Sequence, residues 1–180
     1  MSLRRWRLGD AAALSRLVGE NLEHLRPWMP WVQQEPLTLV ARLKTIRAWE
    51  SQFRSGGDLW VGVFLGGHAI GAAGLRRRRG PEALEIGYWI RERFTGCGYA
   101  TRSASLLSDL AFSMPGIARV EIHHDRANTA SGRVAARAGF IFSSQDPVAS
   151  KAPGESGVEC TWILSRGRWM EMRGTQCQGG

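Results

Sequence analysis

A glycine-rich turn between a strand and a helix is the feature that most constrains this chain. Residues 93–101, Arg-Phe-Thr-Gly-Cys-Gly-Tyr-Ala-Thr, follow an apolar run from Leu84 to Ile90 and precede a helical pattern of apolar residues. Such a turn leaves backbone N–H groups unpaired at the positive end of the helix dipole. The stretch therefore predicts an anion site, and most simply a phosphate site.

Length and composition predict one folded α/β domain. The chain has 180 residues, of which 43% are hydrophobic and 22% charged, which is ordinary for a globular protein. No apolar run is long enough to span a membrane, and the polar N-terminus does not resemble a signal peptide. The widely spaced Cys97, Cys160 and Cys177 form neither a disulfide framework nor a metal motif, so we expect no metal and a cytoplasmic location.

The order of hydrophobic periodicities predicts a mixed sheet with helices on its faces. A first strand and two helices precede a three-stranded antiparallel meander, and the last strand of this meander opens a β-α-β-α-β-β series. We expect strands at Leu3–Leu8, Trp60–Leu65, Ala69–Leu75, Leu84–Ile90, Arg119–His124, Phe140–Ser143 and Val158–Leu164, and helices beginning after Asp10 and at about Leu37, Gly98 and Ala130. Residues 1–173 are expected to form the domain, and residues 174–180 a flexible tail.

Three kinds of phosphate loop compete for the glycine turn. A Walker loop requires a lysine after the glycines, and none is present. A dinucleotide fingerprint would place Thr101 at its third glycine position, and it belongs to an early βαβ unit rather than to the middle of a chain. The third pattern, Arg93-x-x-Gly96-x-Gly98, fits both the spacing and the context. It resembles the coenzyme A pyrophosphate loop of the GNAT N-acyltransferases.

Three further segments extend this resemblance. Asn128-Thr-Ala-Ser131 and the later Gly139-Phe140 are similar to the segment that follows the loop in that superfamily. Glu85 to Ile90 and Leu25 to Trp31 resemble its RimJ/RimL-like branch of ribosomal-protein N-acetyltransferases. The resemblance implies the GNAT fold, in which the two central strands splay apart and acyl-CoA enters between them.

The resemblance also implies which residues hold acetyl-CoA. The expected contacts are backbone groups of the strand, Arg93, the loop and the following helix, namely Tyr88, Trp89, Ile90, Arg93, Gly96, Cys97, Gly98, Tyr99, Ala100 and Asn128. A backbone N–H at Trp89 or Ile90 would stabilise the oxyanion. Cys97 stands where many relatives have Lys or Arg, and we interpret it as a tolerated small residue rather than a nucleophile.

Acyl transfer to an amine also needs a base and an acid for the departing thiolate. Glu85 is the first candidate base, acting through water, with a structural salt bridge as the alternative and Glu121 as a second candidate. Ser131 is the candidate acid, unless it only satisfies the helix N-terminus. His123 and His124 close a neighbouring strand and are expected mainly to be structural. Trp28 and Trp31 are expected to form an apolar wall on the acceptor side, or simply to pack a proline-broken turn.

The resulting prediction is a cytoplasmic N-acetyltransferase that acts on a protein N-terminus or a small amine. A non-catalytic acyl-CoA-binding module and a succinyl-CoA donor remain alternatives, the latter only if the cluster Arg76 to Arg79 folds over the donor instead of forming a solvated hairpin tip. A polyamine acceptor is disfavoured, because a protein with a net charge of +8 would repel a polycation. A basic nucleic-acid-binding domain is a third alternative, which the lack of aromatic residues interleaved with the arginine cluster disfavours. No membrane partner is expected, because no apolar run is long enough to span a membrane. A homodimer is left open.

Overall fold

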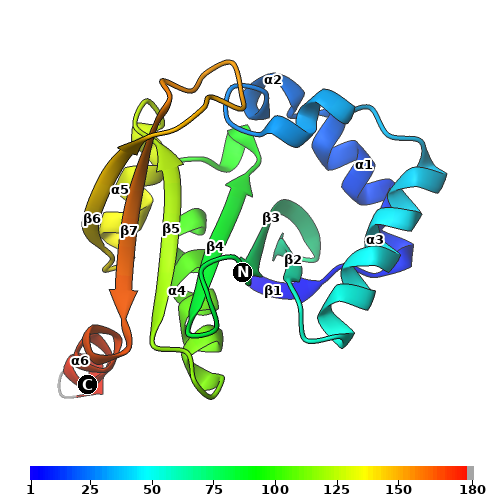
Figure 1. Cartoon of the computed structure of the whole chain (residues 1–180). Coiled ribbons are helices and arrows are strands. Elements are labelled where there is room, and N and C mark those ends of the chain that lie inside the picture. The colour runs from blue at the N-terminus through cyan, green and yellow to red at the C-terminus, as the bar shows by residue number, and fades with distance from the viewer. Residues whose placement is uncertain (178–180) are drawn as a thin grey trace.

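Seven strands form one sheet in the part of the chain that the computed structural model describes, residues 1–177. Figure 1 shows this sheet with helices on both sides. The spatial order is β1-β2-β3-β4-β5-β7-β6, so the last strand in the sequence lies inside the sheet. The strands are β1 (Ser2–Arg5), β2 (Leu59–Leu65), β3 (His68–Arg76), β4 (Ala83–Ile90), β5 (Arg119–Asp125), β6 (Ile141–Pro147) and β7 (Val158–Ser165).

The only parallel contact within this sheet joins β4 and β5, and it is short. These strands pair at three positions, Ala83 with Arg119, Leu84 with Val120 and Glu85 with Glu121. Both strands then continue, to Ile90 and Asp125, without pairing with each other. We call this opening, between residues 86–90 of β4 and 122–125 of β5, the fork. The splayed strands implied by the sequence are therefore confirmed.

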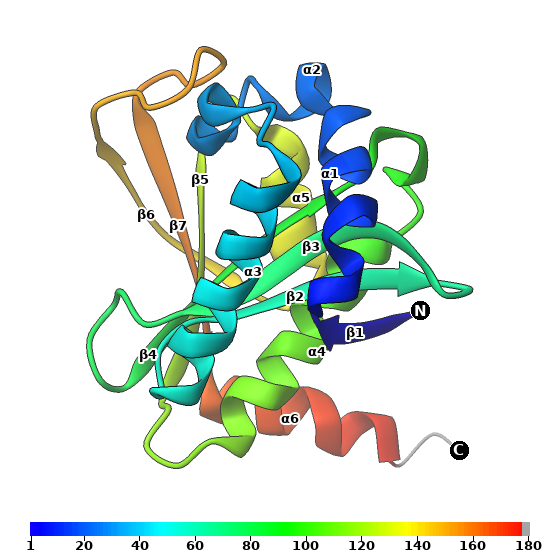
Figure 2. The same ribbon diagram turned by 90° about the vertical axis from the view of Figure 1, so that its right-hand side faces the viewer.

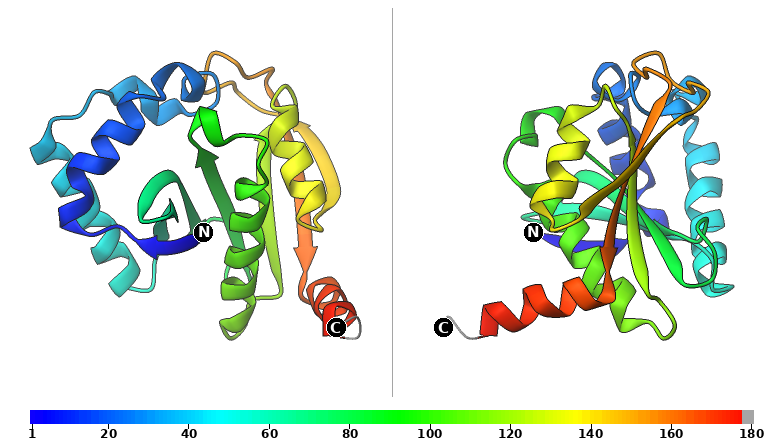
Figure 3. Two further views of the ribbon diagram at one scale, coloured as in Figure 1. Left: turned by 180° about the vertical axis from the view of Figure 1, so that it is seen from behind. Right: turned by 60° about the vertical axis from the view of Figure 1, so that its left-hand side comes forward.

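Helices cover the two faces of the sheet, as Figure 2 and Figure 3 show. On one face lie α1 (Ala11–Gly19) and α3 (Leu39–Arg54), joined through α2 (Leu22–Leu25) and the short 3-10 helix η2 (Pro30–Gln34). On the other lie α4 (Tyr99–Ser113) and α5 (Thr129–Arg137). Two separate apolar clusters correspond to these faces, with Ile86, Tyr88 and Ile90 packed on the α4 side and Trp89 on the α1 side. Successive residues of β4 therefore alternate between the two faces of the sheet.

The ends of the chain differ from the sequence-based expectation. The first strand stops at Arg5, and Leu8–Asp10 forms the 3-10 helix η1. The expected tail from residue 174 overlaps α6 (Arg166–Cys177), and residues 178–180 lie outside the described part. Trp169 of α6 donates to Asp109 of α4 over 2.7 Å and contacts the ring of Phe112. These contacts with α4 explain why residues 166–177 form a helix although their polar sequence has no clear helical pattern of apolar residues.

The β6–β7 loop closes one end of the molecule, beside α2 in Figure 1. Its Gly154 N–H donates to the carbonyl of Pro27 over 2.9 Å. Asp125, at the end of β5, holds the base of the loop by accepting from Ser156 Oγ, Gly157 N and Val158 N at 2.8–3.2 Å. Burial alone would raise the pKa of Asp125, but these hydrogen bonds outweigh it and lower the pKa to about 2.

A buried ion pair fixes the segment that leads into α3. Arg42 Nη2 lies 2.7 Å from Glu35 Oε1, with side-chain exposures of 5% and 4%. Arg42 Nε also donates to Ser15 Oγ of α1. The pair thus ties the η2 segment to both helices of its face. None of the helices described is long and apolar enough to cross a membrane.

We predict that Arg42→Ala lowers the free energy of unfolding by about 3–5 kcal/mol, because it leaves the carboxylate of Glu35 buried without its partner. Arg54→Ala is the matched control on the same helix, since its ion pair with Glu50 is 74% and 43% exposed. That control should change stability by less than about 0.5 kcal/mol. Urea denaturation of both variants measures the difference, and equal losses would contradict the role of burial.

The hydrogen bonds of Asp125 predict a specific pH dependence of stability. Because the folded pKa lies below the usual value of 3.8, the contribution is fully present above about pH 4 and disappears as the pH falls through about 2. Unfolding measured from pH 7 to pH 2 should show wild type more stable than Asp125→Asn by about 1 kcal/mol at neutral pH, after allowance for solvent screening. The difference should vanish near pH 2, and a constant difference would refute the assignment.

Candidate active site

The glycine turn forms the N-terminus of α4 with two residues in the left-handed region. Gly96 has φ +75° and Gly98, the N-cap residue, has φ +79°. A Cβ atom at either position would meet nothing within 4 Å. The turn therefore requires glycine at both positions for its backbone conformation.

The N–H groups of this turn are available to an anion. The first bond of the helical type in α4 runs from Arg102 N to Gly98 O over 2.9 Å. The preceding N–H groups, including those of Tyr99 and Ala100, have no partner of that type, because the first turn of a helix has no earlier carbonyl to bind. Residues 95–98 are exposed. The geometry is that of a phosphate site at a helix N-terminus.

The side chains of the turn add little chemistry of their own. The thiol of Cys97 is exposed, and it donates to the carbonyl oxygen of Thr95, 3.5 Å from Sγ, rather than to a histidine that could act as its base. The guanidinium of Arg93 lies over the ring of Phe94, 4.8 Å from its centroid, and is exposed. Tyr99 packs edge-on against the same ring. Arg93 is thus free to approach an anion from the solvent side, while Cys97 keeps its interpretation as a small residue.

Backbone groups of β4 that face the fork can be assigned from its pairing with β3. Arg91 N donates to Ile70 O over 2.7 Å, and β3 and β4 are antiparallel. In such a pair alternate residues direct both N–H and C=O to the same neighbour. Trp89 therefore faces β3, in agreement with its carbonyl lying beside Gly71. Tyr88 and Ile90 face the fork instead. The N–H of Trp89 is directed to β3, so of the two oxyanion donors expected only the N–H of Ile90 faces the fork.

On the α4 side of the fork, β4 is joined to the N-terminus of α5 by a pair of hydroxyl groups. Tyr88 Oη lies 2.9 Å from Ser131 Oγ. Asn128 is the N-cap of α5, and its Oδ1 accepts from Ser131 N over 3.1 Å. Burial raises the pKa of Tyr88 to about 12, although the bond with Ser131 opposes this shift. Two of the predicted residues, Asn128 and Ser131, are thus brought beside Tyr88.

On the opposite face, a network of charges lies at the root of the fork. Glu85 is buried and pairs with Arg76 and, over 3.1 Å, with Arg79. Its register partner Glu121 is also buried and accepts from Arg119 Nε over 2.7 Å and from His123 Nε2 over 2.8 Å. Both candidate bases therefore have cationic or hydrogen-bonding partners, and the salt bridge considered for Glu85 is present. In residues 1–177 no group of three or more His, Cys, Asp or Glu is placed to hold a metal ion.

The electrostatics of this network are set by burial and by the ion pairs together. Burial lowers the pKa of Arg76, and the charge of Glu85 opposes that shift. For Glu121 burial would raise the pKa, but hydrogen bonds from Arg119 and His123 outweigh it and the net shift is downward. Arg79 also lies 3.9 Å from Glu121 of β5 and 3.8 Å from Glu159 of β7, so it reaches acidic residues on three strands. The cluster of residues 76–79 is therefore divided, since Arg77 and Arg78 are exposed while Arg76 and Arg79 turn inward.

Aromatic residues flank the fork on the same side as Glu85. Trp31 of η2 contacts Trp89 of β4, with ring centroids 6.3 Å apart. Trp28 is half-buried on the turn before η2. His124 does not join the charge network, because its Nε2 accepts from Trp162 and its ring stacks on the same residue. The structure thus brings Trp31 to the candidate site and keeps His124 structural.

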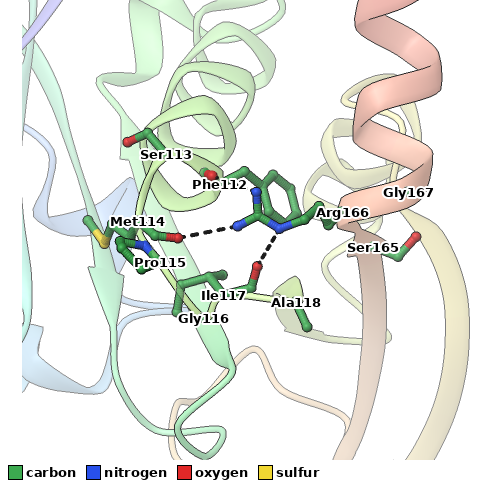
Figure 4. Close-up of a pocket in the computed structure, with 10 residues that line it drawn as sticks. All are labelled: Phe112, Ser113, Met114, Pro115, Gly116, Ile117, Ala118, Ser165, Arg166 and Gly167. Carbon is green, nitrogen blue, oxygen red and sulfur yellow. Dashed lines mark hydrogen bonds between the residues drawn. The ribbon is translucent and has the colours of Figure 1, made fainter.

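A hollow of about 530 Å³ at the other end of α4 is separate from this site. Figure 4 shows that Arg166 fills part of it with its guanidinium group. Arg166 donates to the carbonyls of Phe112, Met114 and Ile117 at 2.8–3.2 Å. It thereby satisfies carbonyls at and beyond the C-terminus of α4, and the hollow shares no residue with the glycine turn or the fork.

Sequence reasoning missed two contacts of this site. The pairing of Arg76 with Glu85 follows from the register of the β3–β4 hairpin, where these residues are opposite each other. The expected hairpin therefore carried a signal for it. Tyr88 and Ser131 are 43 residues apart, and no local pattern connects them.

Comparison with known proteins gives the same family that the sequence resembles. The family model described as an acetyltransferase (GNAT) domain matches residues 1–141. Among curated proteins, none matches this chain.

Solved structures share the fold over nearly the whole chain. RimL, a ribosomal L7/L12 alpha-N-protein acetyltransferase in complex with coenzyme A, is 23% identical with a TM-score of 0.83, covering 91% of this chain and 92% of that one. Mycobacterium smegmatis RimJ in complex with CoA-disulfide is 22% identical with a TM-score of 0.80, covering 97% and 88%. The microcin C7 self-immunity acetyltransferase MccE, in complex with acetyl-CoA and AMP, is 20% identical with a TM-score of 0.82, covering 91% of each chain. With the match of the family model over most of its length, this chain belongs to the GNAT acetyltransferase family.

Proposed function

We propose that this protein transfers the acetyl group of acetyl-CoA directly to a primary amine in the cytoplasm. The observation that supports this most is the meeting of two features at one place. The unpaired N–H groups at the start of α4 lie just beyond the end of β4, and Ile90 of that strand directs its backbone groups into the fork. A pyrophosphate on the turn would leave the rest of acetyl-CoA to follow β4 into the fork.

The proposed chemistry uses groups on both faces of the sheet. The ammonium form of the amine first loses a proton to water held by Glu85, and the neutral nitrogen attacks the thioester carbon while Ile90 N–H stabilises the oxyanion. The nitrogen, positively charged after the attack, loses a second proton to the same water. As the C–S bond breaks, the departing sulfur takes the proton of Ser131 Oγ. Two protons thus pass to solvent through the water at Glu85 and one returns to Ser131, so each cycle releases one proton.

The acceptor is proposed to be the amino terminus of a peptide or a small amine. Trp31 and Trp89 offer an apolar wall on the same face as Glu85. Two proteins of the same fold, RimL and an acetyltransferase of Salmonella typhimurium, act on the N-terminus of ribosomal protein L7/L12. Acetyl is favoured over succinyl, because Arg76 and Arg79 are engaged by Glu85 and would have to leave it to bind a carboxylated acyl group.

A thiol-release assay with acetyl-CoA and a panel of amines tests this function. The panel should include peptides with different N-terminal residues, small aromatic amines and a polyamine, and succinyl-CoA should be compared as donor. We expect turnover with acetyl-CoA and at least one peptide or small amine, and weaker turnover with succinyl-CoA. Binding of coenzyme A without thiol release in the presence of any amine would favour the alternative, a non-catalytic acyl-CoA-binding module. The ion pairs of Glu85 with Arg76 and Arg79 are the observation that favours this alternative.

We predict that Glu85→Gln lowers kcat by about 10²-fold or more, because the water at the fork loses its base. The KM for acetyl-CoA should stay the same, since Glu85 lies at the root of the fork and away from the glycine turn. Steady-state kinetics, with thermal unfolding as the check on folding, separate this from a salt-bridge role. A variant that unfolds at lower temperature but keeps the kcat of wild type would show that Glu85 is structural.

We predict that Gly98→Ala weakens the binding of coenzyme A by about tenfold, because a left-handed residue with a side chain costs about 1–2 kcal/mol and the turn relaxes. Gly116→Ala is the matched control, since Gly116 has φ +78° and equally open space but lies beyond the other end of α4. Both variants should lose similar stability. Calorimetric titration with coenzyme A should show a loss of affinity only for Gly98→Ala.

A further inference from the structure

The bond between Tyr88 and Ser131 joins the two sides of the fork. Tyr88 is on β4, and Ser131 is in the first turn of α5, which follows β5. The distance of 2.9 Å between Oη and Oγ is that of a hydrogen bond between hydroxyls, in which either oxygen can donate. Tyr88 Oη also lies within donating distance of the carbonyl oxygen of Ser131, at 3.2 Å, so the side-chain hydroxyl is the nearer of two partners of the phenol.

Neither element needs this bond to form. The N-terminus of α5 is capped by Asn128, whose Oδ1 accepts from Ser131 N, so the serine hydroxyl is not required as a cap. The ring of Tyr88 packs against the apolar cluster under α4, which a phenylalanine would also fill. The two hydroxyls therefore have a reason to meet other than helix capping or core packing.

The direction of the bond determines what Ser131 can do. The raised pKa of Tyr88, about 12, keeps the phenol protonated at neutral pH. Each hydroxyl has one proton, so when Tyr88 donates to Ser131 Oγ the proton of Ser131 is free to point elsewhere. Without the phenol, the serine hydroxyl can rotate toward backbone acceptors of its own helix, and its proton is then turned away from the fork.

We infer that Tyr88 is a positioning residue that orients the hydroxyl of Ser131 so that its proton faces the sulfur of the departing coenzyme A. This inference rests on the proposed function, because it assigns a partner to the acid of that reaction. It adds no covalent step, since the proton passes from Ser131 Oγ to sulfur as before and Tyr88 keeps its own. The role belongs to the phenolic oxygen alone.

The test compares Tyr88→Phe, Ser131→Ala and the double variant in the thiol-release assay. Tyr88→Phe should lower kcat about tenfold, the effect of one hydrogen bond that matters in the transition state. It should leave the KM for acetyl-CoA and the melting temperature close to wild type. Ser131→Ala should lower kcat at least as much, and the double variant should be no slower than Ser131→Ala, because the phenol then has no hydroxyl to orient.

Ser131→Thr and Ser108→Ala complete the design. Threonine keeps a hydroxyl, so Ser131→Thr should retain part of the rate and should still lose rate when Tyr88→Phe is added. Ser108→Ala removes a buried hydroxyl that bonds Ala104 O within α4, away from the fork, and should leave kcat unchanged.

The inference is overturned if Tyr88→Phe keeps full kcat, or if it slows Ser131→Ala by the same factor as wild type. A fall in melting temperature with an altered KM but unchanged kcat would show a merely structural bond. If Ser131→Ala is fully active, the inference fails while acetyl transfer stands. Absence of thiol release from wild type with every amine is seen before any variant is compared, and it removes the proposed function and this inference together.

Discussion

The fork depends on opposite charges held together where β4 and β5 last touch. Glu85 and Glu121 are register partners and both are buried, so two carboxylates would repel each other at this point. Arg76, Arg79 and Arg119, with His123, surround them and convert repulsion into a network. The strands are therefore tied at their N-terminal ends while their C-terminal ends part. Every feature proposed for binding or catalysis is arranged along that opening.

The network also separates the two faces of the sheet by chemistry. The charges and the pair Trp31–Trp89 lie on the side of α1 and α3, whereas the glycine turn, Tyr88 and Ser131 belong to the side of α4 and α5. A donor held by the turn and an amine held by the tryptophans would meet only through the fork. The order of groups across the sheet thus matches a reaction between two substrates that approach from opposite sides.

Most of the fold could be predicted because its signals are local. The meander, the helix after the glycine turn and the alternation of β4 all follow from periods within single elements. The helix α6 could not, because its contacts with Asp109 and Phe112 depend on tertiary packing. The candidate site shows the same difference. The turn at Gly96 and Gly98 could be predicted from neighbouring residues, whereas the contacts of Glu85 with Arg76 and Arg79, and of Ser131 with Tyr88, join different elements and could not. The exclusion of Trp89 as an oxyanion donor needed the register of β3 and β4.

The order of strands has a consequence for how the protein is made. Because β7 lies between β5 and β6, β6 has no neighbour and β5 lacks one along its second edge until the last strand has been synthesised. The meander β2-β3-β4 can assemble early during translation, whereas the sheet beyond β5 stays open until residues 158–165 have emerged. Arg166, which satisfies carbonyls at the end of α4, also arrives at that late stage. A nascent chain that stalls before residue 158 would therefore expose unpaired strand edges, which are the surfaces that invite misassembly and chaperone binding.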